Sequence, residues 1–142
     1  MKKILKVSIL LICIFLVTGC LGTKKLTCTL KEEEVDQEYE MKLVYTYKKN
    51  KLEQIKLNVE YIVIDDEDLF GMVEDSYKEL YDSFEKDKGV KTNIKTKNNK
   101  LTLNLEVDVP KLSKEVKDKL DYNYGTYDEV KEYLESNRYT CK

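Results

Sequence analysis

Residues 39–63 read YEMKLVYTYKKNKLEQIKLNVEYIV and decide the fold. Apolar and aromatic side chains occupy every second position from 39 to 47, and the same alternation returns from 55 to 63. A period of two is typical of a strand with one buried face. The polar residues 48–51 separate the two runs. The stretch therefore predicts a β-hairpin with one apolar face and one polar face.

Two further regions repeat this strand pattern. Residues 26–30 form a short strand candidate ahead of the hairpin. A second hairpin is predicted at 90–97 and 100–109, because every odd-numbered residue of its second strand from 101 on is leucine or valine and two asparagines fill its turn. Pro110 ends the pairing, since proline has no N–H to donate to a neighbouring strand.

The remaining segments have helical spacing. The longest predicted helix begins at the acidic residues 65–68 and ends at Gly89. A shorter helix follows Ser113, and Thr126 with Glu129 has the spacing of a capping box for the last helix. The apolar positions of the three helices are Leu69, Phe70, Val73, Tyr77, Leu80, Tyr81 and Phe84; Leu112, Val116 and Leu120; and Val130, Tyr133 and Leu134.

This order of elements, closed by an extended segment at 138–142, predicts an α+β fold. We expect an antiparallel sheet of two hairpins plus short terminal strands. The long central helix and the two short C-terminal helices would cover one face of that sheet. Residues 26–142 would form this single domain, which is long enough for a core of ordinary size.

The N-terminal segment has a different character. Three lysines precede an apolar run at 7–17, which is too short to cross a hydrocarbon core of about 30 Å as a permanent helix. Val17-Thr18-Gly19-Cys20 follows and resembles the lipobox of bacterial lipoproteins. The resemblance implies that 1–19 are a signal peptide, that Cys20 carries the lipid, and that 20–25 are the lipidated N-terminus and a short spacer. The alternative is an ordinary secretory signal, or an uncleaved membrane helix, with an incidental cysteine.

Such an anchor predicts a location on the extracytoplasmic face of the cell membrane. The composition indicates the kind of cell. The chain has no alanine, and Arg138 is the single arginine among 25 basic residues. Abundant lysine, isoleucine, asparagine and tyrosine match AT-rich codons, which indicate a low-GC Gram-positive bacterium.

The cysteines fit an exported chain. Of the four, Cys13 lies in the predicted signal and Cys20 in the lipobox, which leaves Cys28 and Cys141. One remaining pair in an exported chain predicts a structural disulfide. A redox or metal-binding pair is the alternative, but the chain has no C-x-x-C spacing and no histidine to complete a metal site.

Composition restricts the chemistry. Without histidine, Ser-His-Asp and Cys-His nucleophilic sites and histidine acid–base catalysis are excluded. No P-loop or dinucleotide-binding motif occurs, so we predict no cofactor. Catalysis by paired carboxylates, as in glycoside hydrolases, is the least favoured hypothesis. The formal net charge is −2, and −5 without the three signal lysines, which argues against nucleic acid and anionic lipid headgroups as partners.

Two segments are candidate ligand sites. Asp65-Asp66-Glu67-Asp68 is an acidic cluster that could bind calcium, although an EF-hand loop needs acids at alternate positions. A cap of the following helix is the favoured interpretation. Tyr122, Tyr124 and Tyr127 lie in a glycine-containing loop and form a candidate recognition loop. Packing against the last helix is the favoured alternative for these tyrosines.

Several segments spread over most of the chain resemble a known protein family. The lipobox, residues 43–52 (LVYTYKKNKL), the long central helix, Gly89-Val90 and residues 101–105 (LTLNL) together resemble the YehR-like small bacterial lipoproteins. These are exported proteins with no established activity. The resemblance therefore implies a location and a fold, and it offers no catalytic residue to carry over.

The leading functional hypothesis is a non-enzymatic, membrane-tethered domain that binds an unknown protein or another envelope partner. The polar face of the sheet would meet that partner. The residues predicted on it are Lys42, Thr46, Lys56, Asn58, Glu60, Thr102, Asn104 and Glu106. The second hypothesis is a small-ligand or metal-ion binder that uses residues 65–68 or the loop at 122–127.

Overall fold

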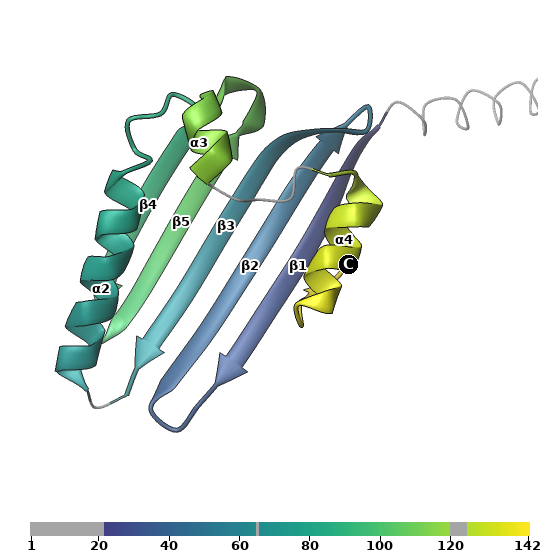
Figure 1. The fold of residues 1–142 in the computed structure, drawn as a ribbon. Coiled ribbons are helices and arrows are strands. Elements are labelled where there is room, and N and C mark those ends of the chain that lie inside the picture. The colour runs from purple at the N-terminus through teal and green to yellow at the C-terminus, as the bar shows by residue number, and fades with distance from the viewer. Residues whose placement is uncertain (1–21, 65, 120–124) are drawn as a thin grey trace, which may run out of the picture.

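The alternating segments form a six-stranded antiparallel sheet in the computed structural model, which describes residues 22–64, 66–119 and 125–142 (Figure 1). The strands lie in the order β4-β5-β3-β2-β1-β6. Their bounds are β1 Thr23–Glu33, β2 Gln37–Lys48, β3 Lys51–Val63, β4 Val90–Lys97, β5 Lys100–Asp108 and β6 Thr140–Cys141. The two predicted hairpins join through β3 and β5, so they build one continuous sheet.

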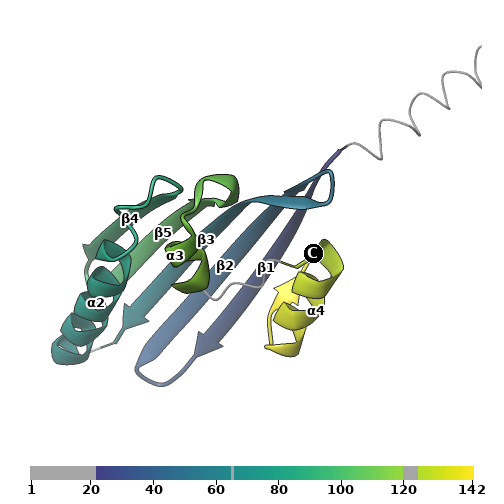
Figure 2. The same ribbon diagram turned by 45° about the horizontal axis from the view of Figure 1, so that its top comes forward.

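The helices lie on one face of the sheet (Figures 1 and 2). α2 (Glu67–Asp82) runs along the β4 side, and α4 (Tyr127–Ser136) runs along the β1 side. α3 (Lys114–Lys119) follows a 3-10 turn at Val109–Lys111. We call the face beneath these helices the covered face and the opposite one the open face. No helix of the described residues lies over the open face.

The register of the strands explains the core. Leu26 is paired with Tyr45, Tyr45 with Ile55, and Ile55 with Val107, so one row of apolar side chains crosses four strands. Each of these side chains is at most 2% exposed. Full burial of an apolar side chain contributes about 1.5–3 kcal/mol. The alternation read from the sequence therefore locates the covered face correctly.

Two-residue turns close both hairpins. Lys49 and Asn50 connect β2 to β3, and Asn98 and Asn99 connect β4 to β5. All four residues have positive φ, between 51° and 61°. Left-handed backbone at both central positions matches the twist of the flanking strands and favours asparagine.

The α+β class is confirmed, but the first strand is longer than predicted. β1 pairs with β2 along its whole length, from Thr23 opposite Lys48 to Glu33 opposite Glu38. The sequence pattern marks only residues 26–30, because the ends of β1 are polar and carry no apolar alternation. Backbone hydrogen bonds to β2 extend the strand regardless of side-chain polarity.

The long helix is shorter than predicted. α2 ends at Asp82 with Ser83 as its C-cap, and turns fill the chain up to Gly89. Phe84 still enters the core, although it lies beyond the helix. A Cβ at Gly89 would lie 2.8–2.9 Å from backbone atoms that include Leu112 N and Asp108 O. Gly89 is therefore required for close backbone approach, and the predicted helix stop at this residue is wrong, because the helix already ends at Asp82.

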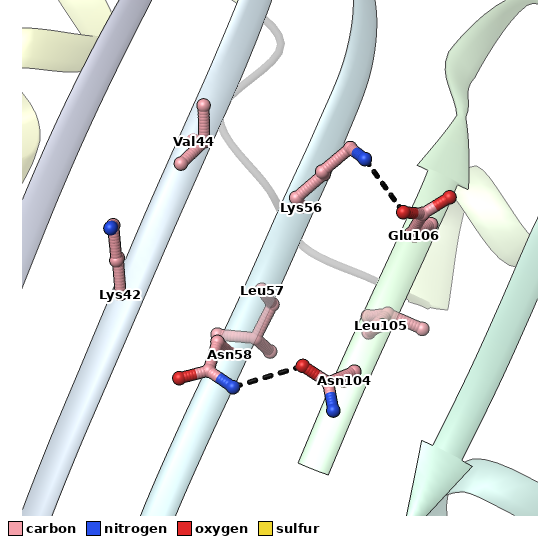
Figure 3. A pocket seen from close by; sticks show the side chains of 8 residues that line it. All are labelled: Lys42, Val44, Lys56, Leu57, Asn58, Asn104, Leu105 and Glu106. Atoms are coloured by element: carbon pink, nitrogen blue, oxygen red, sulfur yellow. Dashed lines mark hydrogen bonds and ion pairs between the residues drawn. The ribbon is translucent and has the colours of Figure 1, made fainter.

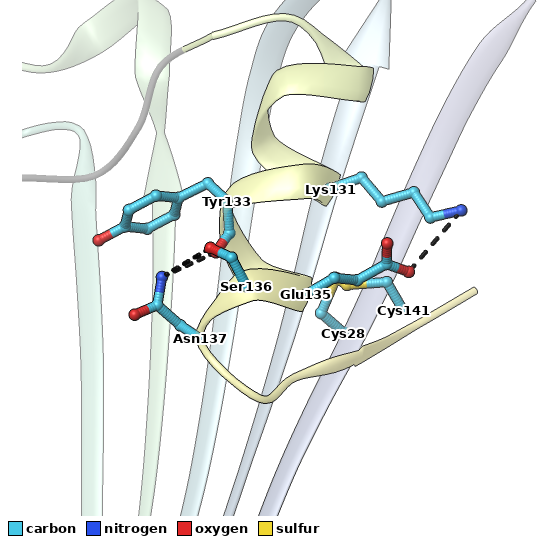
Figure 4. Close-up of a disulfide and its surroundings, with 7 residues drawn as sticks. All are labelled: Cys28, Lys131, Tyr133, Glu135, Ser136, Asn137 and Cys141. Atoms are coloured by element: carbon cyan, nitrogen blue, oxygen red, sulfur yellow. Dashed lines mark hydrogen bonds and ion pairs between the residues drawn. A yellow bond between two sulfur atoms is a disulfide. The ribbon is translucent and has the colours of Figure 1, made fainter.

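The chain terminus confirms the predicted disulfide. β6 pairs with β1, which places Cys141 opposite Cys28 at a Cα–Cα distance of 4.1 Å, and their sulfurs are bonded (Figure 4). Thr27 and Lys142 exchange backbone hydrogen bonds beside this pair. Arg138, with a φ of 70°, reverses the chain after α4 so that the last strand can reach β1. The disulfide thus ties the C-terminus to the edge of the sheet.

Candidate functional site

The open face displays the polar half of each strand. Successive side chains of a strand point to opposite faces, so the neighbours of the core residues point here. All eight residues predicted for the polar face lie on it. Its central members are Thr27, Thr29, Lys42, Val44, Thr46, Lys56, Asn58, Glu60, Lys91, Asn93, Thr102, Asn104 and Glu106.

A row of side-chain amides crosses the middle of this face. Lys42 is paired with Asn58, Asn58 with Asn104, and Asn104 with Asn93. Asn58 Nδ2 donates a hydrogen bond of 2.9 Å to Asn104 Oδ1 (Figure 3). Within the described part of the chain, Asn58 Oδ1 and Asn104 Nδ2 form no further hydrogen bond. These two atoms are available to an external donor and an external acceptor.

An ion pair lies beside the amide row. Lys56 Nζ is 2.7 Å from Glu106 Oε1, and both side chains remain more than 40% exposed (Figure 3). The hydrogen bond from Lys56 lowers the pKa of Glu106, and the charges of Lys56 and Lys91 add to that effect. Glu106 is therefore ionised at neutral pH and acts as a hydrogen-bond acceptor.

The amide row and the ion pair line one shallow hollow. Its volume is about 320 Å³, and the residues around it are Lys42, Val44, Lys56, Leu57, Asn58, Asn104, Leu105 and Glu106. Small-molecule pockets are usually enclosed by apolar and aromatic side chains. None of the described residues that line this hollow is aromatic. The geometry therefore suits a polar macromolecular surface better than a small apolar ligand.

The acidic cluster at the start of α2 works as a helix cap. Asp66 Oδ1 accepts a hydrogen bond of 2.8 Å from the backbone N–H of Leu69. Glu67 and Asp68 follow in the first turn, where negative charge is favourable. Asp65 lies outside the described residues. Among the residues that the structure describes, no group of three or more cysteine, aspartate or glutamate side chains is placed to hold a metal ion.

The predicted recognition loop falls only partly within the described residues. Tyr122 and Tyr124 lie outside them. Tyr127 begins α4, and its ring packs edge-on against Tyr47 with centroids 5.8 Å apart. Burial raises the pKa of Tyr47 to about 12, and its hydroxyl donates to the carbonyl of Gly125 over 3.4 Å. Tyr127 thus helps to fix α4 to the sheet.

A second hollow on the covered face has no counterpart among the sequence predictions. It measures about 200 Å³ and is lined by Glu32, Glu34, Gln37, Tyr39 and Tyr61. The two tyrosine rings meet edge to face at 6.1 Å, and the Tyr61 hydroxyl donates to Gln37 Oε1. Arg138 Nη2 lies 2.9 Å from Glu32 Oε1, in an ion pair without hydrogen-bond geometry. Only the pairing of β1, β2 and β3 brings these residues together, so no local sequence signal marks them.

No helix within the described residues is long and apolar enough to cross a membrane. By sequence, neither a protein-family model nor a curated protein matches the chain.

Two solved structures share the fold. The NMR structure of the YehR protein of E. coli superposes with a TM-score of 0.57 at 14% identity, and the match covers 84% of this chain and 92% of that one. An NMR structure of a protein from Streptococcus pneumoniae TIGR4 gives a TM-score of 0.53 at 16% identity, over 85% of this chain and 86% of that one. At these identities the likeness shows a common fold.

Proposed function

We propose that this chain is a non-enzymatic lipoprotein of the YehR-like kind, anchored through Cys20 at the extracytoplasmic face of the membrane. Its open face would bind a partner protein of the cell envelope. The lipobox resemblance at residues 17–20 supports the anchor. The fold shared with E. coli YehR over most of both chains supports the kinship.

The amide row carries the proposal for the open face. Asparagine is disfavoured in strands, where β-branched residues such as valine and threonine pack better. Here Asn58, Asn104 and Asn93 stand directly opposite one another on three adjacent strands. A sheet selected for stability alone would carry threonine or valine at these positions. Hydrogen bonding to a partner gives a reason for the amides.

The charges beside the row indicate the chemistry of the partner. Lys42, on β2, offers a hydrogen-bond donor. The ion pair between β3 and β5 offers a second donor, Lys56, and an acceptor, Glu106. Such a mixture fits a polar protein surface that presents both backbone and side-chain groups. The described residues that line the hollow offer polar and charged groups and no aromatic ring on which a sugar could stack.

Crosslinking capture from intact cells tests this proposal. The test protein carries Asn58→Ala, Asn104→Ala and Lys56→Glu, and the control carries Asp75→Ala and Glu79→Ala on the exposed side of α2. We expect the wild type and the control to retain the same partner and the open-face variant to lose it. Retention of that partner by a folded open-face variant would refute the proposal. Capture of cell-wall fragments in place of a protein would also refute the choice of partner.

A further inference from the structure

Charge is segregated along the first three strands. Lys24 and Lys25 begin β1, and its register places them beside the end of β2. Lys48, Lys49 and Lys51 surround the β2–β3 turn at the same end of the sheet. We call these five lysines the basic end. The other end of the same strands, which we call the acidic end, carries Glu32, Glu33, Glu34, Asp36 and Glu38, with Asp66, Glu67 and Asp68 nearby on the way into α2.

The lysines of the basic end have exposed side chains. Among residues 22–64, 66–119 and 125–142, none of the five takes part in an ion pair. Lys24 Nζ approaches the ring of Tyr127 at 6.0 Å. At the acidic end, by contrast, Glu32 and Glu33 face the internal cations Arg138 and Lys31. Glu53 lies on the same part of β3 and Glu129 lines a hollow together with Lys51, but among the described residues neither forms an ion pair with these lysines, so their charge is available to an external anion.

The N-terminal segment reaches the sheet at the basic end. β1 begins at Thr23, three residues after Cys20, and even a fully extended chain spans only about 10 Å over that distance. Electrostatic attraction in physiological salt acts over about 8 Å. A lipid on Cys20 would thus hold the basic end within range of charged headgroups.

We propose that the basic end docks on the anionic headgroups of the membrane and sets the strands upright, with the acidic end pointing away. The inference rests on the lipid anchor of the proposed function. It also revises the expectation drawn from net charge, because the value of −5 for the chain without its three signal lysines is an average that hides five lysines gathered at one end of β1, β2 and β3. The upright strands would keep the open face clear of the bilayer for its partner.

Lysine footprinting of the full-length lipidated protein in vesicles tests the docking. Vesicles of phosphatidylcholine are compared with vesicles that contain phosphatidylglycerol, and acylation of each lysine is read by mass spectrometry. On anionic vesicles we expect acylation of the basic-end lysines to fall about fivefold or more. Attraction to an anionic surface contributes about 1 kcal/mol per lysine, which shifts the equilibrium between the bound and the free lysine by about this factor. Lys95 and Lys97, which lie toward the other end of β4, are the internal controls, and high salt should abolish the difference.

A pair of charge-matched variants sharpens this test. K48E/K49E should remove the protection of Lys24 and Lys25, whereas K95E/K97E, with the same change of charge at the other end of the sheet, should keep it. Equal acylation of the basic end on both kinds of vesicle would overturn the docking and leave the anchor standing. Failure of the protein to float with either kind of vesicle would instead overturn the anchor and, with it, this inference.

Discussion

The two faces of the sheet are built from the same strands and follow different rules. On β5, Leu103 is fully buried beneath the helices, and Asn104, the next residue, is exposed on the open face. The covered face is a continuous layer of leucine, isoleucine, valine and tyrosine, whereas the open face is a mixture of amides, hydroxyls and charges. Stability therefore resides in one set of alternate residues, and we assign binding to the other.

The largest loss of stability should follow removal of the disulfide that joins β6 to β1. Replacing Cys28 and Cys141 with serine opens a loop with a sequence separation of 113 residues. In the chain-entropy model such a loop contributes about 4–5 kcal/mol to the free energy of unfolding. Urea denaturation of both proteins measures the difference. A decrease of less than about 1 kcal/mol in the free energy of unfolding would show that tying the C-terminus to β1 contributes little to stability.

Neighbouring residues on β5 compare the faces directly. Leu103→Ala should lower the free energy of unfolding by about 2–5 kcal/mol, because it leaves a cavity in the core. Asn104→Ala, one residue away on the other face, should change it by about 0.5 kcal/mol or less. Both values come from urea denaturation. Similar losses for the two variants would refute the division between stability and binding.

Substitution of two glycines by alanine should change stability by smaller amounts and in opposite directions. Gly89→Ala should cost about 1–3 kcal/mol, since its Cβ would lie within 3 Å of three backbone atoms. Gly71 lies inside α2, where an added Cβ would have nothing within 4 Å, so Gly71→Ala should stabilise the protein by up to about 1 kcal/mol. Thermal denaturation of the two variants measures both effects. Opposite signs are expected, and destabilisation by Gly71→Ala would contradict the packing described for α2.

The buried tyrosines make the covered face sensitive to alkali. The pKa of Tyr47 is raised from 10 to about 12 in the folded protein, so the folded state holds its proton more tightly than the unfolded state. The stability that the protonated Tyr47 contributes to the folded state is fully present below pH 10, and it is lost as the pH rises towards 12. At pH 11 the loss should be about 1 kcal/mol. Tyr47→Phe should weaken this pH dependence, and an unchanged slope would contradict the assignment.

The sequence predicts the covered face better than it predicts the edges of the sheet. Alternation from Tyr39 to Tyr47 and from Leu101 to Val109 is a local property, and it identifies the residues of the covered face, of which Tyr39, Met41 and Val109 are only partly buried. The same pattern misplaces the ends of β1, which backbone pairing with β2 determines, and the end of α2, after which the chain turns and Phe84 enters the core. These constraints come from residues distant in sequence.

The candidate site shows the same limit. Its eight polar residues follow from alternation alone, but the amide row requires the register between β3 and β5. Asn58 and Asn104 are 46 positions apart, and nothing in their local sequences shows that they hydrogen-bond. The basic end likewise depends on the pairing of Lys24 with the strand that ends at Lys48.

The most direct test of the central claim is site-specific photocrosslinking in intact cells. A photoreactive amino acid is placed at Thr102, on the open face two residues from Asn104, in one protein and at Asp75 on the exposed side of α2 in another. We predict a discrete protein adduct from position 102 and none from position 75. The same adduct from position 75 alone, or equal adducts from both positions, would contradict the assignment of binding to the open face.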